Sequence, residues 1–228
     1  MPALTEAVHD ELGGVRVARR CCHRAEIATV LRLSAAVGRR DGRLVVVADL
    51  DEVVAARRLH TLITGAFGYP VRLTVLSASG PGRSGRHRVS VGGADAAGLA
   101  RRVGLLDRHG RLVRGLPPAV IGGPACDAAA VWRGAVLAGG RLARPGHRLP
   151  LQVNSPDQMV GLALVGAARR LGVTARSAVA HGRWRGWPCP TTRRSWRCST
   201  ASVPPSARAP GSRAHRRRRL PRRWGSTA

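Results

Sequence analysis

The spacing of apolar side chains predicts that helices and strands alternate over residues 22–106. In some stretches apolar residues recur every three to four positions, which is typical of helices that bury one face. In others they alternate with polar residues or form short runs, which is typical of strands in a partly buried sheet. The expected order is helix 22–37, strand 42–50, helix 51–68, strand 69–76, strand 86–93 and helix 94–106.

The same order returns about one hundred residues later, which indicates an internal duplication. The helix CDAAAVWRGAVLAGGRL matches the first helix when Cys126 is set opposite Cys22, and a strand, a helix and another strand follow it. A linker with Gly and Pro, residues 109–123, separates the two copies. The strand RHRVSVGG of the first copy has no counterpart in the second, so we expect an incomplete second half.

Alternation along the strands predicts a sheet with one apolar and one basic face. A basic sheet face can follow the DNA backbone and position a protein without reading its sequence, but an ordinary solvent-exposed face explains the pattern equally well. The expected inward residues are Leu44, Val46, Ala48, Leu73, Val75, Val89, Val91, Leu149, Leu151 and Val153. The candidate DNA-contact residues are Arg43, Arg72, Arg86, Arg88, Arg148 and Arg176.

Composition strengthens the case for a nucleic-acid partner. The 228 residues carry a formal net charge of +27, and all 39 basic residues are Arg, a usage typical of GC-rich coding DNA. Such a charge favours a polyanion, because each phosphate that is neutralised releases a condensed counterion. The Gly-containing stretches at 92–98 and 122–130 do not lead from a strand into a phosphate-binding motif, so we expect no nucleotide cofactor and no small-molecule substrate.

The composition changes near Gly182. Residues 1–181 hold 26 Arg and all 12 acidic residues, whereas residues 182–228 hold 13 Arg, no acidic residue and four of the five Trp. A basic disordered arm, a Trp-containing module and translation in a shifted reading frame are all compatible with this segment. The third explains the missing residue types best, because a one-base shift of GC-rich codons restores a strand, an acidic turn and an amphipathic helix. We therefore expect a disordered Arg-rich tail of out-of-frame origin.

Cysteine and histidine positions suggest no metal site. The five Cys form no CxxC pair, and Cys21, Cys22 and His23 are adjacent, whereas a tetrahedral site usually needs a second spaced pair. We expect no metal, and cysteines buried as small apolar residues. No segment approaches the roughly 18 apolar residues of a membrane span, and the N-terminus is acidic where a signal peptide is basic. This predicts a cytoplasmic, nucleoid-associated protein with no membrane partner.

Four phrases, in order, resemble the WhiA family of bacterial sporulation and cell-division transcription regulators: MPALTEAVHDELGGV, CCHRAEIATVLR, GLLDRHGRLVRGLPPAVI and CDAAAVWRGAVLAGGRL. The resemblance covers about residues 1–181 and implies an α+β fold, the duplicated αββαββ scaffold of LAGLIDADG homing endonucleases in degenerate form. The implied divisions are an N-terminal helix with the first half at 1–108, a linker at 109–123, an incomplete second half at 124–181 and a disordered basic tail at 182–228.

The resemblance also implies a DNA-binding regulator of sporulation septation and cell division that acts on promoters with a WhiB-type partner. In that family a C-terminal helix-turn-helix domain follows the endonuclease-like domain. This chain lacks it and looks truncated or frameshifted after about residue 181, so we expect weakened sequence-specific binding. The alternative is a protein-interaction module that binds a WhiB-type partner without DNA affinity of its own.

The same resemblance argues against an enzyme. Homing nucleases hold a divalent metal with one acid near the end of each small-residue helix. Counting along the motif places those positions at Ala35 and Gly139, which offer no carboxylate. The helices would then keep a packing role, with Gly134, Ala138 and Gly140 at their contact.

Overall fold

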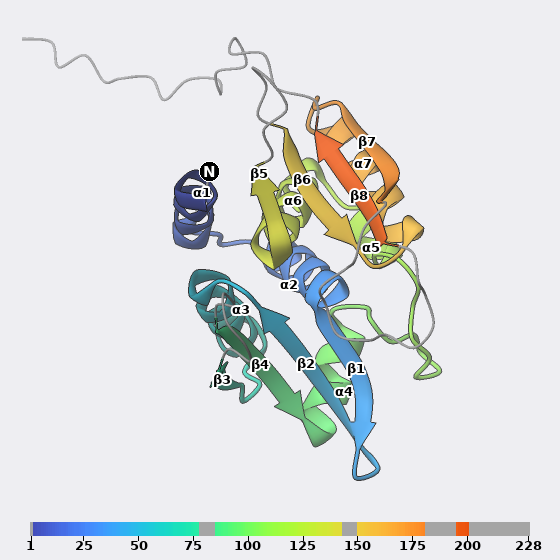
Figure 1. Ribbon diagram of the computed structural model, residues 1–228. Helices are drawn as coiled ribbons and strands as arrows, with labels where there is room; N and C mark the ends of the chain where they lie inside the picture. The colour runs from blue at the N-terminus through green and yellow to red at the C-terminus, as the bar shows by residue number, and fades with distance from the viewer. Residues whose placement is uncertain (1, 78–84, 143–149, 181–194, 201–228) are drawn as a thin grey trace, which may run out of the picture.

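Two halves of similar build lie on either side of a central pair of helices (Figure 1). The structure, a computed structural model, describes residues 2–77, 85–142, 150–180 and 195–200. The first half contains α2 (Arg20–Ser34), β1 (Ala35–Arg40), β2 (Arg43–Leu50), α3 (Val53–Phe67), β3 (Arg72–Leu76), β4 (Arg86–Gly92) and α4 (Gly93–Arg102). The second half contains α6 (Ala125–Gly139), β5 (Gly140–Leu142), β6 (Leu151–Ser155), α7 (Gln158–Arg170), β7 (Ala175–Ala180) and β8 (Ser195–Thr200). Helix α1 (Pro2–Gly14) precedes both, and the short α5 (Pro118–Ile121) lies in the linker.

Each half forms a four-stranded antiparallel sheet with the same connectivity. The strand orders are β1-β2-β4-β3 and β5-β6-β8-β7. The registers also match, because Ala35 pairs with Ala48 in the first sheet and Gly140 pairs with Val153 in the second, a constant offset of 105 residues. The predicted α+β class and the duplicated αββαββ scaffold are confirmed.

The first strand of each half begins where the sequence predicted that a helix would continue. Helix α2 ends at Ser34, and Ala35 already has extended backbone angles. In β1, half-buried Ala35 and Val37 alternate with exposed Ala36 and Gly38. Pairing with β2 supplies backbone hydrogen bonds that outweigh the helix propensity of alanine. The same competition ends α6 at Gly139 and starts β5.

A strand also occupies the place that was expected to be empty in the second half. The backbone of Ser195–Thr200 forms β8, which pairs with β6 on one side and β7 on the other. These residues belong to the segment assigned to the tail, so the boundary at 182 is corrected for residues 195–200. Backbone pairing does not need an apolar side-chain pattern, which is why the composition concealed this strand. Among the described residues, none forms a counterpart of α4 in the second half.

The core is centred on the contact between α2 and α6, where two backbones come unusually close. A Cβ atom built on Gly134 would lie 2.7 Å from the carbonyl oxygen of Glu26 and 3.2 Å from Thr29 Cβ. Thr29 is buried, and its hydroxyl donates to the carbonyl of Ala25 at 2.8 Å. Only hydrogen fits at position 134 without moving the facing helix.

A buried carboxylate joins several elements at this contact. Glu26 of α2 is completely buried, and Arg58 of α3 donates to both its oxygens, Nε to Oε1 and Nη2 to Oε2 at 3.1 Å. Arg133 of α6 donates Nε to Oε2 at 2.7 Å. Arg58 Nη1 also donates to the carbonyls of Gly13 and Val15, at 2.9 and 2.8 Å. One acid therefore ties both halves and the end of α1 together.

Helix α1 lies beside the end of α6. His9 is buried, and its Nε2 donates to the carbonyl of Gly140 at 3.0 Å. Thr5 Oγ1 accepts from the backbone N–H of Leu142 at 3.4 Å, which extends the contact to β5. Every helix in the described part of the chain is too short or too polar to cross a membrane.

Replacing Gly134 tests the close helix contact. Gly134→Ala is expected to lower the free energy of unfolding by about 1–3 kcal/mol, because the added methyl group overlaps backbone atoms of α2. Gly166→Ala in α7 is the matched control, since the space around that helical glycine is open, and there the change should be neutral or stabilising by about 0.5–1 kcal/mol. Urea unfolding measures both. Equal stabilities of the two variants would contradict the contact.

Removing the buried carboxylate should be more damaging. Glu26→Ala leaves Arg58 and Arg133 buried without their partner, and we expect it to lower the free energy of unfolding by about 3–5 kcal/mol. Asp51→Ala removes one partner of an exposed ion pair, Arg86–Asp51 at 2.9 Å, and should cost less than about 1 kcal/mol. If chemical denaturation gives similar losses for both, Glu26 does not have the assigned role.

Candidate nucleic-acid interface

The helices cover one face of the first sheet and leave a basic face uncovered (Figure 1). The covered face contributes buried Val46, Ala48, Val89 and Val91. By strand alternation and register, the opposite face carries four of the predicted arginines and one more that the sequence analysis missed. These residues are Arg43, Arg72, Arg86 and Arg88, with Arg40 as the addition.

A groove on this face is lined by Arg40, Arg72 and Arg88 together with the half-buried valines Val45 and Val47. A second, more open hollow beside it is lined by Arg40, Asp41 and Arg43. Arg40 was missed because the predicted helix ran to residue 37 and residues 38–41 were assigned to no strand. Strand alternation from residue 35 would have placed Arg40 on this face. The groove has no enclosed wall on which to orient a small molecule, and its charged groups suit an extended anion.

Two of the predicted arginines are already neutralised within the sheet. Arg88 donates Nε and Nη2 to the two carboxylate oxygens of Asp49 at 2.7 and 2.8 Å, and this hydrogen bonding raises the pKa of Arg88. Arg86 donates to Asp51 and to the Asp49 carbonyl. Their charges are paired with Asp49 of β2 and with Asp51 just after it, so the exposed cations of the face are mainly those of its other three arginines.

The second sheet repeats part of this arrangement. Arg72 pairs with Ser90, which pairs with Val47, and in the second half Arg176 pairs with Ser199, which pairs with Gln152. Gln152 is the counterpart of Val47 at the 105-residue offset. Arg72 and Arg176 are therefore equivalent, and both are exposed.

Arg141 of β5 pairs with Gln152 from the other side, so it joins the same face and is exposed. It was not predicted, because the helix expected over 126–142 covered β5. The predicted contact Arg148 and the predicted core residue Leu149 lie outside the described residues. Leu73 and Val75 were expected in the core but are 37% and 71% exposed, because β3 is an edge strand at the margin of its sheet.

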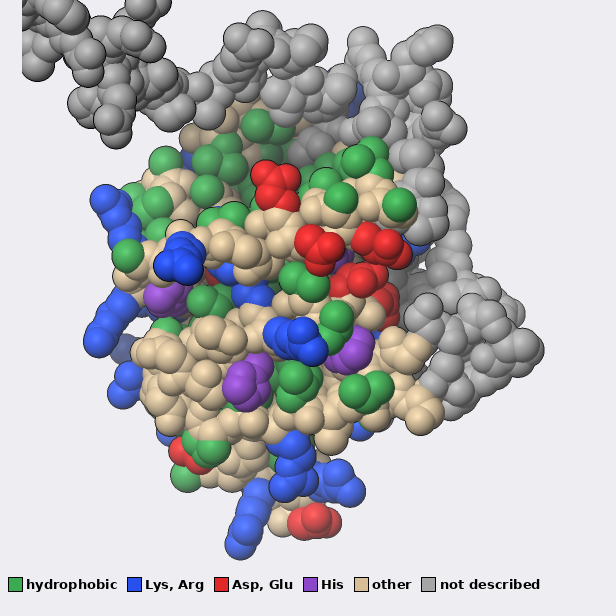
Figure 2. All heavy atoms as spheres, turned by 90° about the vertical axis from the view of Figure 1, so that its left-hand side faces the viewer, with side chains coloured by type: hydrophobic (Ala, Val, Ile, Leu, Met, Phe, Trp, Pro, Cys, Tyr) green, Lys and Arg blue, Asp and Glu red, His purple; other side chains and the backbone are tan. Residues whose placement is uncertain are grey.

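The side of the molecule that carries α1 looks different (Figure 2). Acidic side chains gather in one cluster there, while arginines lie mostly toward its edges. Helix α1 itself contains Glu6, Asp10 and Glu11 and no arginine. The acidic cluster disfavours a polyanion at that place, so the sheets are the stronger candidate surface.

Cysteines from both halves meet where the central helices α2 and α6 begin. Cys21 and Cys22 at the start of α2 lie beside Cys126 and Asp127 at the start of α6, with their ligand atoms all within 4.8 Å of one another. His23 is not part of this group, because its Nε2 donates to the Val17 carbonyl at 2.7 Å. Cys126 and Asp127 of the second half supply a second pair of possible metal ligands, which the amino-acid sequence seemed to lack.

Comparison with known proteins places this fold in a family. The sequence profile of the WhiA N-terminal LAGLIDADG-like domain matches residues 20–106. Those residues are thus similar to a WhiA N-terminal LAGLIDADG-like domain. "Probable cell division protein WhiA" of Frankia alni is 51% identical over 179 residues, 78% of this chain and 55% of that protein. Its namesake in Streptomyces avermitilis is 45% identical over 181 residues, 79% of this chain and 54% of that protein. The chain thus spans about half the length of the curated relatives it matches.

Solved structures share the fold of this WhiA-type chain at low sequence identity. The N-terminal LAGLIDADG domain of DUF199/WhiA aligns with a TM-score of 0.61 at 14% identity, over 87% of this chain and 84% of that one. The homing endonuclease I-DmoI, in complex with DNA and Ca, aligns with a TM-score of 0.52 at 11% identity, over 80% of this chain and 85% of that one. At such identities the likeness concerns the fold alone.

The first-half residue that corresponds to Gly139 differs by one position from the predicted Ala35. Gly139 ends α6, but its counterpart is Ser34, the last residue of α2, and Ala35 instead matches Gly140. The error came from setting Cys22 opposite Cys126, whereas the offset of 105 sets Cys21 there.

None of these end positions carries a carboxylate. Ser34 donates its hydroxyl to the carbonyl of Val30 within the same helix at 2.7 Å. Ala138 and Gly139 are half-buried, and a Cβ on buried Gly140 would lie 2.6 Å from Val136 Cα. Close packing therefore accounts for Gly140, whereas the space around Gly139 is open and its φ of 155° is one that side chains rarely adopt.

Proposed function

We propose that the uncovered faces of the two sheets bind the backbone of duplex DNA, and that in this way the chain serves WhiA-type transcriptional regulation of sporulation septation and cell division. The observation that carries the proposal is the equivalence of Arg72 and Arg176, exposed at matching register positions in two halves. Paired cations related by a pseudo-twofold axis suit a duplex, whose two backbones are related in the same way.

The charge distribution supports backbone contact more than base recognition. Arg40, Arg43 and Arg141 extend the basic row along the sheet faces, and all three are exposed. Arginine binds phosphate oxygens through paired N–H groups and releases counterions, which gives affinity without sequence information. I-DmoI, which has been solved in complex with DNA, shares this fold and adds support. Association with the nucleoid would follow.

We further propose that the chain does not cleave DNA. Hydrolysis by this scaffold needs paired carboxylates that hold a divalent metal against the scissile phosphate. Ser34 and Gly139 stand at the helix ends instead. His9 donates a hydrogen bond to the carbonyl of Gly140, so a structural contact lies at this end of α6.

A second candidate function is docking of a protein partner such as a WhiB-type regulator. Its support is the edge strand β3, where Leu73 and Val75 leave apolar surface exposed beside unpaired backbone. An uncovered edge strand can accept a strand from another protein. In that alternative the exposed arginines of the sheet faces contact only solvent.

Removing exposed arginines from the sheet face tests DNA binding. The triple variant Arg40→Ala, Arg43→Ala, Arg72→Ala should weaken binding of a labelled duplex at all sequences. It should also reduce the slope of log K against log salt by about 2–3, since each lost phosphate contact contributes about 0.9. Fluorescence anisotropy across a salt series provides the measurement.

A second triple variant controls for net charge. Arg57→Ala, Arg101→Ala and Arg169→Ala remove the same charge from exposed positions of α3, α4 and α7. This variant should keep nearly the full salt slope. Equal losses in the two variants would mean that binding depends on overall charge and would reject the proposed face.

Incubation with supercoiled plasmid and magnesium tests the lack of nuclease activity. We expect no metal-dependent nicked or linear product, because Ser34 and Gly139 at the helix ends offer no carboxylate to a metal. Product that forms with magnesium and disappears on addition of a chelator would refute this part of the proposal.

A further inference from the structure

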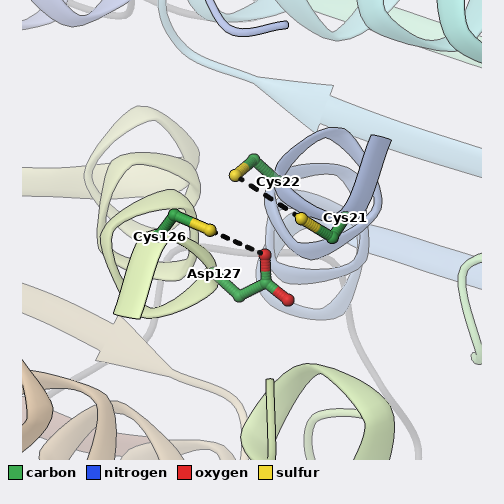
Figure 3. A group of neighbouring side chains, drawn as sticks. All are labelled: Cys21, Cys22, Cys126 and Asp127. Carbon is green, nitrogen blue, oxygen red and sulfur yellow. Dashed lines mark hydrogen bonds between the residues drawn. The ribbon is translucent and has the colours of Figure 1, made fainter. Parts of the chain in front are cut away.

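Four potential metal ligands converge where α2 and α6 begin, at the pole opposite the C-terminal ends of these helices (Figure 3). At the offset of 105 residues, Cys126 is the counterpart of Cys21, and Asp127 is the counterpart of Cys22. Duplication has therefore placed two adjacent ligand pairs on either side of the pseudo-twofold axis. Figure 3 shows all four side chains in the space between the two helices.

The spacing of these groups suits a single small cation. The sulfur atoms of Cys21 and Cys22 lie 3.9 Å apart, and Cys126 Sγ lies 3.8 Å from Asp127 Oδ1. Four ligand atoms at about 2.0–2.3 Å from a tetrahedral Zn²⁺ lie about 3.3–3.8 Å from one another. The set is thus close to the required tetrahedron, with all atoms within 4.8 Å before any metal contracts it.

We propose that Cys21, Cys22, Cys126 and Asp127 bind one Zn²⁺ that clamps the starts of α2 and α6 together. Three soft thiolates with one carboxylate favour zinc over magnesium or calcium, which prefer oxygen ligands. Four protein ligands fill the tetrahedron and leave no open position for a substrate, so the site is structural. Cys21 and Cys126 are only half-buried, which gives the metal a path in.

A buried carboxylate without a salt bridge supports a cation here. Asp127 is 1% exposed and forms no salt bridge in the part of the chain that the structure describes. A buried carboxylate is costly unless it meets positive charge or hydrogen-bond donors. The thiol of Cys126, which donates to Asp127 Oδ1, is a weak donor. A divalent cation would balance this acid and the sulfurs next to it.

The surroundings shift the pKa values of the three thiols in different directions. Burial raises the pKa of the Cys22 thiol to about 12, and the hydrogen bond to Asp127 raises the pKa of Cys21. The hydrogen bond from Cys22 lowers the pKa of Cys126, whose sulfur also accepts from Arg19 at 3.8 Å. Zinc displaces thiol protons, so binding releases protons and weakens as the pH falls.

The experiment uses the full chain, reduced with a phosphine and freed of metal by a chelator. Titration with Zn²⁺ should give one equivalent per chain by elemental analysis after gel filtration, and affinity should fall between about pH 7.5 and pH 6. With Co²⁺, thiolate charge-transfer bands and the intense visible bands of tetrahedral cobalt should appear. Absence of these bands, or binding without stoichiometry, would overturn the proposal.

Variants identify the ligands. Cys126→Ser should lower zinc affinity at least tenfold and weaken the charge-transfer bands, whereas Cys189→Ser, outside the four ligands, should change neither. Asp127→Cys makes the second pair equal to the first and should give the spectrum of a four-thiolate site with higher affinity. Because this variant is expected to gain zinc affinity, a folding defect would not produce the expected result. Equal effects of Cys126→Ser and Cys189→Ser, or an unchanged spectrum in Asp127→Cys, would reject the assignment.

Discussion

The contact between α2 and α6 determines the relative position of the two halves and their sheets. Its closeness requires hydrogen at Gly134, and its lateral position is fixed by Glu26, whose carboxylate holds Arg58 from one half and Arg133 from the other. Replacement of such a buried ion group by apolar residues can be neutral or stabilising, so its main effect is to specify one arrangement. The separation of the two basic sheet faces follows from that arrangement.

Apolar periodicity predicted the helices, most strands and the duplication, because those features depend on which residues are apolar. It failed where backbone pairing prevailed over side-chain preference. Ala35 and Ala36 have high helix propensity, yet pairing with β2 draws them into β1. Residues 195–200 lack a clear apolar pattern, yet two neighbouring strands pair with their backbone. Such tertiary competition cannot be seen in a local window.

The candidate surfaces were predictable to different degrees. Alternation placed Arg43, Arg72 and Arg176 on the strands, but the pairing of Arg88 with Asp49 depends on the register of strands far apart in sequence. The thiol cluster was missed through one residue of misalignment between the repeats. With Cys21 rather than Cys22 set opposite Cys126, the amino-acid sequence by itself shows two matched ligand pairs.

The charges at the centre are not shared equally by the repeats. At the offset of 105 residues, Glu26 of the first half corresponds to Val131 of the second. Arg133 corresponds to Ala28, and Arg58 corresponds to Ala163. A dimer of two first halves would bury two acids near its axis without Arg133, and a dimer of two second halves would bury that arginine without an acid. The central charges are therefore complementary between the two copies rather than repeated in each.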